Sequence, residues 1–463
     1  MRVLPAIKPT PEQLTIITHA GLGVTLITGA AGSGKTSTAL LRLRFLVEYW
    51  RQRMLSGHVD PPIRILVLTF NRTLRGYIAE LAGDQITGNG IELEVTTFAS
   101  WASRLLGGPD IIEDGVRARL IGERLGASLP WTPPFIRDET DYVLGRFLPE
   151  ERDRYLTTPR VGRGASPKVD QTLRQQLLDD VIEPYEAFKA RVGKMDWNDE
   201  AIELARRPPE KMYHIAVVDE GQDFSPNQVR ALLNHLEKDH TLTFVIDAAQ
   251  RIYPHRMLLG DLGVRIGKRH RLTRNYRNTR QIAAFARSIL GDLELPDDAA
   301  LPEVEGCTRE GDRPALVAGP YSQQMNYVVP RLKAAIAKDQ SCAILHALGG
   351  GFFKYTRERL ALAKIPFVEI SRRSAWPTGP ENVALSTMAS AKGLEFDHVY
   401  ILGLNAEVTP HGAEEGDDRL ETYRRLLAMA AGRAKDTVMV GYKPEEASKV
   451  VEYIDPATYD LVR

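Results

Sequence analysis

The sequence predicts an α/β fold with parallel β-sheets and more than one packed unit. Short, apolar, β-branched runs alternate along the chain with segments of helical periodicity. Such runs are typical of strands that are buried on both faces of a parallel sheet, and their alternation with helices indicates the α/β class. The chain has 463 residues, which is too long for one hydrophobic core, so we expect roughly two to four packed units.

The strand signals are short and mostly lack polar alternation. They lie at residues 24–28, 63–68, 215–218, 242–246, 342–345, 383–386, 399–402 and 437–440. Between about residues 109 and 209 the chain instead carries many charges and helical periodicity, without a convincing strand signal. We interpret that region as a helical insertion into the first α/β unit.

The composition excludes several classes of protein. Lys+Arg and Asp+Glu are equal at 60 each, so no global field draws the chain to nucleic acid or membrane, and any nucleic-acid surface must be local. Two cysteines, Cys307 and Cys342, are too few for a disulfide framework, an iron–sulfur cluster or a cysteine-built zinc site. The first residues, MRVLPAIKPTPEQ, contain no apolar core of signal-peptide length, and no stretch approaches the length of a membrane span, so we expect a cytoplasmic protein without membrane contact.

The stretch GAAGSGKT, residues 29–36, matches the phosphate-loop pattern G-x-x-x-x-G-K-[ST]. It follows a predicted strand and opens a predicted helix, as that loop requires. In this pattern the lysine, Lys35, reaches the β- and γ-phosphates, and the hydroxyl of Thr36 ligates Mg²⁺. The predicted nucleotide contacts of the loop are Gly29, Ala30, Ala31, Gly32, Ser33, Gly34, Lys35, Thr36 and Ser37.

The stretch VVDEGQDF, residues 217–224, places several acids directly after a buried strand. We expect that strand to lie beside the phosphate-loop strand, with Asp219 at its carboxyl end as a second Mg²⁺ contact. Glu220 is then suited to orient or deprotonate the attacking water. The alternatives are a free-standing metal site and a solvated turn. Residues 225–228, Ser-Pro-Asn-Gln, predict an N-cap, a proline at the first helical position and a capping box.

Further motifs occur in order along most of the chain. They are PTPEQ (9–13), LTFNRTLRGYI (68–78), TTFASW (96–101), MDWNDEAIELA (195–205), DEGQD (219–223), IDAAQRIY (246–253), LTRNYRN (272–278), STMASAKGLEF (386–396) and YRRLLAMAAGRAK (423–435). Together they resemble the superfamily 1 helicases of the UvrD/Rep type. The resemblance implies two RecA-like P-loop lobes with parallel sheets. Residues 1–108 and 209–270 would form the first lobe, 109–208 the helical insertion, and 271–463 the second lobe.

The resemblance also implies roles for single residues in an ATP site. Gln13 would read the adenine, Tyr276 would stack on it, and Glu395 would lie near the ribose. The residues implied in hydrolysis are Lys35, Glu220, Gln250 as the γ-phosphate sensor, and Arg277 and Arg433 as arginine fingers. Because the two arginines belong to the second lobe, hydrolysis would require the lobes to close.

Nucleic acid is expected to cross both lobes along the strand-binding motifs. The implied contacts are Phe70, Asn71, Thr97, Phe98, Tyr253, Thr387 and Lys392. For each aromatic residue, packing in the core is the alternative. The basic run at 265–277 is either a solvated face or partly a track for the phosphate backbone.

The sequence also departs from the UvrD/Rep pattern. The spacing between the motifs of Arg277 and Thr387 leaves room for one lobe, so we expect that the large 2B insertion is absent. No tryptophan follows the motif of Gln250, although a family member usually has one that stacks on a base. We therefore expect an ATP-dependent translocase or 3′-to-5′ helicase on single-stranded DNA or a 3′-tailed duplex. The alternative is a DNA- and ATP-responsive regulatory subunit with a nuclease or another protein as its partner, as in anti-phage defence.

Overall fold

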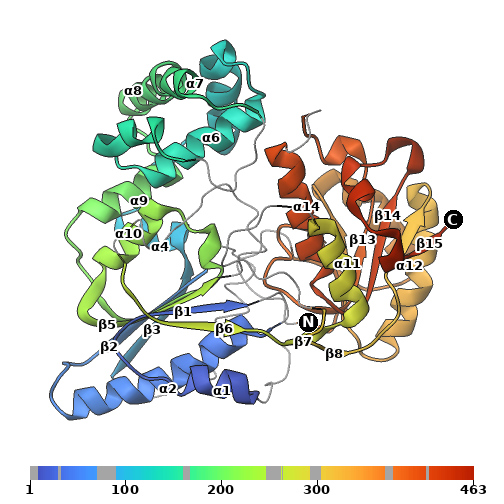
Figure 1. Ribbon diagram of the computed structural model, residues 1–463, viewed down its shortest axis with the longest axis horizontal. Helices are drawn as coiled ribbons and strands as arrows, with labels where there is room; N and C mark the ends of the chain where they lie inside the picture. The colour runs from blue at the N-terminus through green and yellow to red at the C-terminus, as the bar shows by residue number, and fades with distance from the viewer. Residues whose placement is uncertain are drawn as a thin grey trace.

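The computed structural model describes residues 9–29, 33–69, 90–159, 167–246, 262, 264–291, 293, 304–370, 379–412 and 417–463. Two α/β lobes lie side by side, and a group of helices lies on one end of the first lobe (Figure 1). Each lobe has a sheet whose neighbouring strands are all parallel. The predicted fold class, two RecA-like lobes with parallel sheets, is confirmed.

The first sheet has the strand order β3-β2-β4-β5-β1-β6. Its strands are β1 (Gly23–Gly29), β2 (Ile63–Thr69), β3 (Ile91–Thr97), β4 (Tyr213–Val218), β5 (Leu236–Ile246) and β6 (Ile266–Leu272). We expected β4 beside β1, and this was wrong, because β5 lies between them. Apolar runs identify strands but do not specify which buried strands pair.

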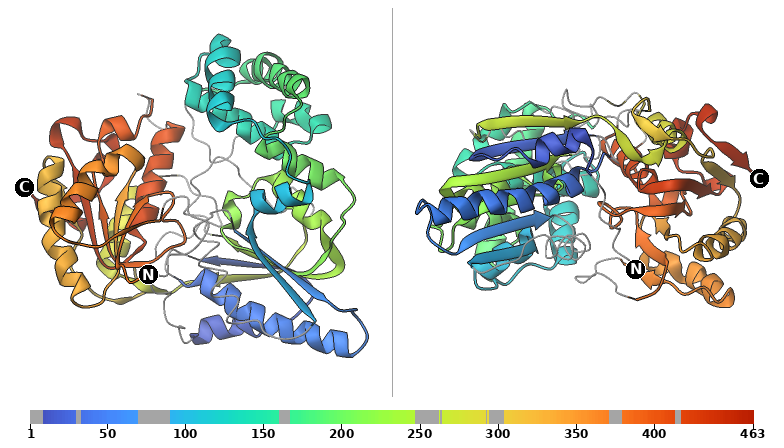
Figure 2. Two further views of the ribbon diagram at one scale, coloured as in Figure 1. Left: turned by 180° about the vertical axis from the view of Figure 1, so that it is seen from behind. Right: turned by 90° about the horizontal axis from the view of Figure 1, so that it is seen from below.

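Helices cover both faces of this sheet, as the second view in Figure 2 shows from below. On one face, side chains of α2 (Lys35–Leu55), including Leu43, pack against Ile65 and Val67 of β2. On the other, Leu66 and Leu68 face a layer of three helices. These are α4 (Phe98–Leu105), α9 (Trp197–Arg206) and α10 (Pro226–Asn234). Alternate residues of one strand thus serve two cores, which explains why the strand shows no polar alternation.

The region between the two parts of the first lobe is helical, with its own apolar core around Trp131, Phe135 and Tyr155. Its elements are α5 (Asp114–Arg119), η1 (Leu120–Arg124), η2 (Leu125–Ser128), α6 (Pro133–Arg146), η3 (Pro149–Leu156), α7 (Gln171–Gln176), η4 (Leu177–Ile182) and α8 (Glu183–Val192). Among its described residues no strand occurs, although Ile111 and Met195 form an isolated bridge at its base.

The second sheet has the order β11-β12-β10-β13-β14-β9-β15. Its strands are β9 (Ala315–Ala318), β10 (Cys342–His346), β11 (Val368–Glu369), β12 (Val383–Thr387), β13 (Phe396–Ile401), β14 (Ala434–Tyr442) and β15 (Asp460–Val462). A separate pair, β7 (Asn275–Thr279) and β8 (Cys307–Arg309), lies at the entry to this lobe.

Two helices pack on each face of the second sheet. α11 (Arg280–Leu290) and α14 (Asp418–Ala431) share one core, and α12 (Tyr321–Ile336) and α13 (Lys354–Leu362) share the other. Both cysteines are buried, as expected for apolar-like residues. None of the described helices is both long enough and apolar enough to cross a membrane.

Candidate active site

The predicted phosphate loop connects β1 to α2, and its described part has the geometry that such a loop needs. Gly34 has a φ of +79°, a left-handed conformation that favours glycine. A Cβ on Gly29 would lie 2.7 Å from Ser33 Oγ, so a larger residue would displace the loop. Three predicted phosphate contacts lie outside the described residues: Ala30, Ala31 and Gly32.

Two side chains that were predicted to bind the nucleotide contact the backbone of this loop. Lys35 Nζ donates a hydrogen bond to Gly29 O at 2.7 Å. Gln13 is buried, and its Nε2 donates to Ser33 O at 3.3 Å. The Oε1 of the same amide closes the capping box that starts α1 (Pro11–Ile17). Ser37 is half-buried in the first turn of α2. Helix capping thus holds Gln13 against the loop.

Asp219 lies directly after β4 and meets the first turn of α2. Its Oδ1 accepts a hydrogen bond from Thr36 Oγ1 at 3.0 Å. The contact forms although β5 separates the two strands, because carboxyl ends of parallel strands share one edge of the sheet. Burial and the adjacent Glu220 raise the pKa of Asp219 to about 7, against the opposing effects of Thr36 and Lys35. A divalent cation at this pair would favour the charged carboxylate.

The oxygen donors of Thr36 and Asp219 fit an Mg²⁺ ion that is also bound by substrate phosphates. They do not fit a metal site that is built from protein ligands alone. Within the described ranges there is no group of three or more His, Cys, Asp or Glu that could hold a metal ion. Mg²⁺ in phosphoryl-transfer enzymes relies on one or two protein ligands, substrate phosphates and water. One hydroxyl and one carboxylate at the edge of the phosphate loop are sufficient for that arrangement.

Glu220 is held in an unusual backbone conformation. Its φ is +54°, a left-handed conformation that costs a non-glycine residue about 1–3 kcal/mol. The side chain is 10% exposed and accepts a hydrogen bond from Gln222 Nε2. Burial alone would raise the pKa of Glu220, but the charges of Lys392, Arg433 and Lys35 hold it below its ordinary value. The carboxylate is therefore ionised, as a proton acceptor requires.

The two predicted arginine fingers come from the second lobe. Arg277 forms an ion pair with Glu395. Its Nε and Nη1 are buried and have no hydrogen-bond partner among the described residues, which suits a side chain that binds an anionic ligand. Arg433 is 3% exposed, lowers the pKa of Glu220 by its charge, and donates from Nε to Met429 O at 3.3 Å. Tyr276, predicted to stack on adenine, is half-buried beside Arg277.

Two asparagines connect the arginine segments, and the sequence reasoning missed them. Asn275 Oδ1 accepts hydrogen bonds from the backbone N–H groups of Arg277 and Asn278, both at 3.0 Å. Asn278 Nδ2 donates to Gly432 O, next to Arg433, at 3.1 Å. Asn275 itself was the signal in the sequence, because asparagine side chains commonly accept hydrogen bonds from the backbone of their own turn.

Lys392 occupies a different place from the one we predicted. We expected it on the path of the nucleic acid, but it is 4% exposed and forms an ion pair with Asp223. Its Nζ is 3.5 Å from Glu220 Oε2. Asp223, which we had not assigned to the site, is 1% exposed. In this structure Lys392 therefore lies against Glu220 and Asp223, and its ammonium group is buried instead of facing solvent.

The predicted strand contacts Thr97 and Thr387 have equivalent positions in the two lobes. Each ends a strand, and each hydroxyl accepts a hydrogen bond from the backbone N–H of the serine three residues later, Ser100 at 3.2 Å and Ser390 at 3.0 Å. Phe98 differs from the prediction, because it is 3% exposed and packs in the core, so its ring cannot stack on a base in this conformation. Four predicted residues lie outside the described ranges: Phe70, Asn71, Gln250 and Tyr253.

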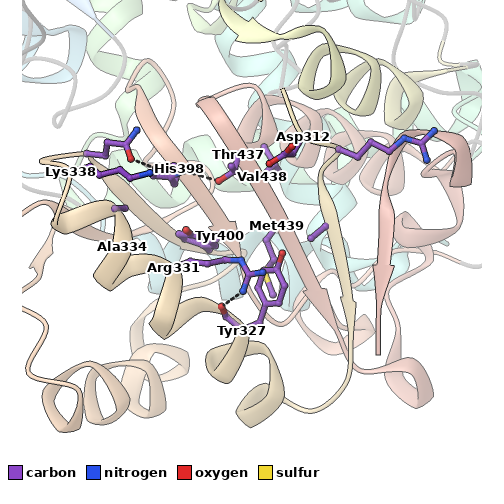
Figure 3. Close-up of a pocket in the computed structure, with 14 residues that line it drawn as sticks. Asp312, Tyr327, Arg331, Ala334, Lys338, His398, Tyr400, Thr437, Val438 and Met439 are labelled. Atoms are coloured by element: carbon purple, nitrogen blue, oxygen red, sulfur yellow. Dashed lines mark hydrogen bonds between the residues drawn. The ribbon is translucent and has the colours of Figure 1, made fainter. Parts of the chain in front are cut away.

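A cavity of about 260 Å³ lies elsewhere in the second lobe, between α12 and the strands β13 and β14. Figure 3 shows His398 and Tyr400 among the side chains that line it, together with Arg331, whose guanidinium lies over the ring of Tyr327. His398 hydrogen-bonds to Thr437. None of the residues predicted to bind ATP or nucleic acid lines this cavity, so it is separate from those predicted sites.

Comparison with known proteins agrees with this geometry. The model of an AAA domain family matches residues 13–256, and that of the UvrD-like helicase C-terminal domain matches residues 365–445. The ATP-dependent DNA helicase UvrD2 of Mycobacterium tuberculosis is 30% identical over an alignment of 327 residues, and the match covers 62% of this chain and 44% of that protein. The probable DNA helicase II homolog of Mycoplasma capricolum is 22% identical over an alignment of 386 residues, and the match covers 77% of this chain and 51% of the relative.

The similarity has clear bounds. The chain spans about half the length of the curated relatives it matches. The solved C-terminal domain of a possible DNA helicase from Lactobacillus plantarum is 22% identical, and the match covers 40% of this chain and 98% of that one, with a TM-score of 0.31.

The first family match extends from Gln13 to beyond Asp219 and Glu220, and the second includes Glu395 and Arg433. The chain therefore belongs to the UvrD/Rep-type superfamily 1 helicases.

Proposed function

We propose that this protein is an ATP-dependent translocase on single-stranded DNA, with 3′-to-5′ helicase activity on a 3′-tailed duplex. The observation that carries the proposal is the convergence of both lobes on one carboxylate. Glu220 comes from the first lobe, whereas Lys392 and Arg433, whose charges lower its pKa, come from the second. Hydrolysis at Glu220 would therefore depend on how the lobes meet. In this proposal the protein acts on DNA in the cytoplasm.

The residues have distinct jobs in this proposal. Mg²⁺ held by Thr36 and Asp219 would neutralise charge on the β- and γ-phosphates. Glu220 accepts the proton of the attacking water, for which its ionised state is suited. The cations that face the charge developing on the γ-phosphate are Lys35, Arg277 and Arg433. Gln13, in α1, reads the adenine from its position against the phosphate loop, and Gln250 senses the γ-phosphate.

Lobe closure provides the link between hydrolysis and movement. If Arg277 and Arg433 act on the phosphate only when the lobes approach, each ATP cycle closes and reopens the gap between them. A strand held at Thr97 in one lobe and Thr387 in the other would then be gripped alternately. The equivalent capped turns at these two threonines support this assignment. The polarity follows from the family resemblance.

The second candidate function is an ATP- and DNA-responsive switch that regulates a nuclease or another protein partner. The observation that favours it is the burial of Phe98, which is 3% exposed. Base–aromatic stacking contributes about 1–3 kcal/mol per base, so a strand without this platform would be held more weakly. Weak binding of the strand is sufficient for a switch that responds to bound DNA. It is less suitable for a translocase that moves along DNA over many ATP cycles.

Displacement of streptavidin distinguishes the two functions. The protein is given ATP and a single strand with biotin–streptavidin at its 5′ end, and in parallel a 3′-tailed duplex. A translocase moving 3′ to 5′ displaces the streptavidin at the 5′ end and not one at the 3′ end, and a helicase also separates the duplex. ATP hydrolysis without displacement from either end would reject the translocase and favour the switch.

A further inference from the structure

Lys392 is buried between two carboxylates of the other lobe. It lies in the segment after β12 in the second lobe, is 4% exposed, and forms an ion pair with Asp223 Oδ2. Its Nζ is also 3.5 Å from Glu220 Oε2. Asp223 and Glu220 both belong to the short turn after β4 in the first lobe. One buried cation thus bridges the lobes at the catalytic carboxylate itself.

Physical grounds argue against a purely stabilising role for this arrangement. Burial of a lysine and two carboxylates costs several kcal/mol per ion in desolvation, which the attraction between them repays only with good geometry. An apolar cluster would hold two lobes together at lower cost. A charge placed there instead controls the orientation and ionisation of the groups around it.

The segment that carries Lys392 also touches two other functional positions. It begins at Thr387, whose hydroxyl caps the turn through Ser390, and it ends at Glu395, which pairs with Arg277. Lys392 lies between them in the chain. If bound DNA moves Thr387 at one end of this segment, the movement would therefore change the positions of the partners of both Glu220 and Arg277.

We propose that Lys392 is a positioning residue for ATP hydrolysis, which holds the Glu220 carboxylate for proton transfer through its ion pairs with Glu220 and Asp223. This inference rests on the proposed ATPase function. It assigns Lys392 to the coupling of the lobes and removes it from direct contact with nucleic acid. Asp223 is its anchor, because it shares the same ammonium group and is almost fully buried, at 1% exposure.

The test is steady-state ATPase of the full chain with variants of both partners. Lys392→Met should lower kcat by about 100-fold, as expected for a misplaced catalytic group, while the Kd for Mg–ATP stays within about twofold. Lys392→Arg should recover part of kcat because it retains the charge. Asp223→Asn should also lower kcat. An unchanged kcat in Lys392→Met, or an increased one, would overturn the proposal.

A double variant separates positioning from folding. Lys392→Met combined with Asp223→Asn leaves fewer unpaired buried charges, so its Tm should recover relative to Lys392→Met alone. If Lys392 acts by positioning, kcat of the double variant should remain near that of Lys392→Met. Recovery of kcat together with Tm would mean a purely structural role and would reject the proposal.

Two controls complete the design. Arg357→Ala removes an ion pair with Glu369 on the same lobe, away from Glu220, and should leave kcat unchanged. Glu220→Gln tests the proposed function itself. If the wild-type protein hydrolyses ATP and loses that activity in Glu220→Gln, a wild-type rate in Lys392→Met refutes the role of Lys392 alone. If the wild-type protein does not hydrolyse ATP, it is the proposed function that fails.

Discussion

The Thr36 hydroxyl lies 3.0 Å from Asp219 Oδ1, although 183 positions separate the two residues in sequence. Thr36 opens the helix after the phosphate loop, and Asp219 ends the strand β4. The contact joins the two halves of the first lobe on either side of the helical insertion. Thr36 Oγ1 and Asp219 Oδ1 are also the two oxygen atoms that we propose as protein ligands of Mg²⁺.

Glu220→Gln should abolish turnover and preserve ATP binding. The substitution removes the proton acceptor but leaves the phosphate contacts of Lys35 and Thr36 in place. General-base catalysis contributes about 10²–10⁴-fold, so we expect kcat to fall by at least about 10²-fold. Phosphate release and binding of a fluorescent ATP analogue measure the two quantities. Wild-type turnover in this variant would remove Glu220 from its role.

Arg433→Ala should slow hydrolysis with little effect on the affinity for Mg–ATP. An arginine finger acts on charge that develops in the transition state, and it contributes about 10³-fold or more in rate. Single-turnover hydrolysis and equilibrium binding together give the required comparison. The matched control is Arg357→Ala, a half-exposed arginine of the same lobe that pairs with Glu369. Equal losses in both variants would contradict the assignment.

Gln13→Ala should reduce the preference for ATP over GTP. The amide lies against Ser33 of the phosphate loop and is fixed by the capping box of α1. Without it, the adenine loses its hydrogen-bonding partner, while the triphosphate contacts remain. Competition of each nucleotide against a labelled analogue measures the ratio. An unchanged ratio would show that the base is read elsewhere.

The stability of the first lobe should depend on the ionisation of Glu200. Burial, with a contribution from Asp196, raises the pKa of Glu200 from 4.5 to about 7, although the Ser103 hydroxyl opposes the shift. Between about pH 4.5 and pH 7 the folded protein retains a proton that the unfolded chain has lost. Stability contributed by the protonated group is therefore lost as pH rises through this window, by up to about 3 kcal/mol.

The variant Glu200→Gln should remove that loss. Its Tm should fall less than that of the wild type between pH 5 and pH 8, because the amide has no proton to release in this range. Glu203→Gln is the control, since Glu203 lies in the same helix and its side chain is 40% exposed. If Tm depends on pH in the same way in Glu200→Gln and in the wild type, the raised pKa of Glu200 would be contradicted.

Elements with strong local signals could be predicted from the sequence. The apolar runs identified β1, β2, β4 and β5 because each is buried on both faces. The start of α10 was predicted from Ser225, Pro226 and Gln228, and the capping box is present. Edge strand β6, in contrast, was interpreted as a basic run, because its charged side chains face solvent and obscure the strand signal.

Pairings over long sequence distances could not be predicted. The order of strands in the first sheet depends on packing across the whole lobe, so the sequence did not indicate that β5 lies between β4 and β1. Lys392 was misplaced for a similar reason. Its partners Glu220 and Asp223 belong to the other lobe. The sequence around a lysine does not indicate whether its ammonium group meets a phosphate or a buried carboxylate.

The most direct test of the central claim, that both lobes act together on one ATP and one strand, is the ATPase rate with and without single-stranded DNA. Phosphate release is measured at saturating Mg–ATP while an unstructured oligonucleotide is titrated, with Glu220→Gln as the blank. We predict a rate that rises with the oligonucleotide and saturates, because a bound strand favours closure. A rate that is the same with and without DNA would contradict the account.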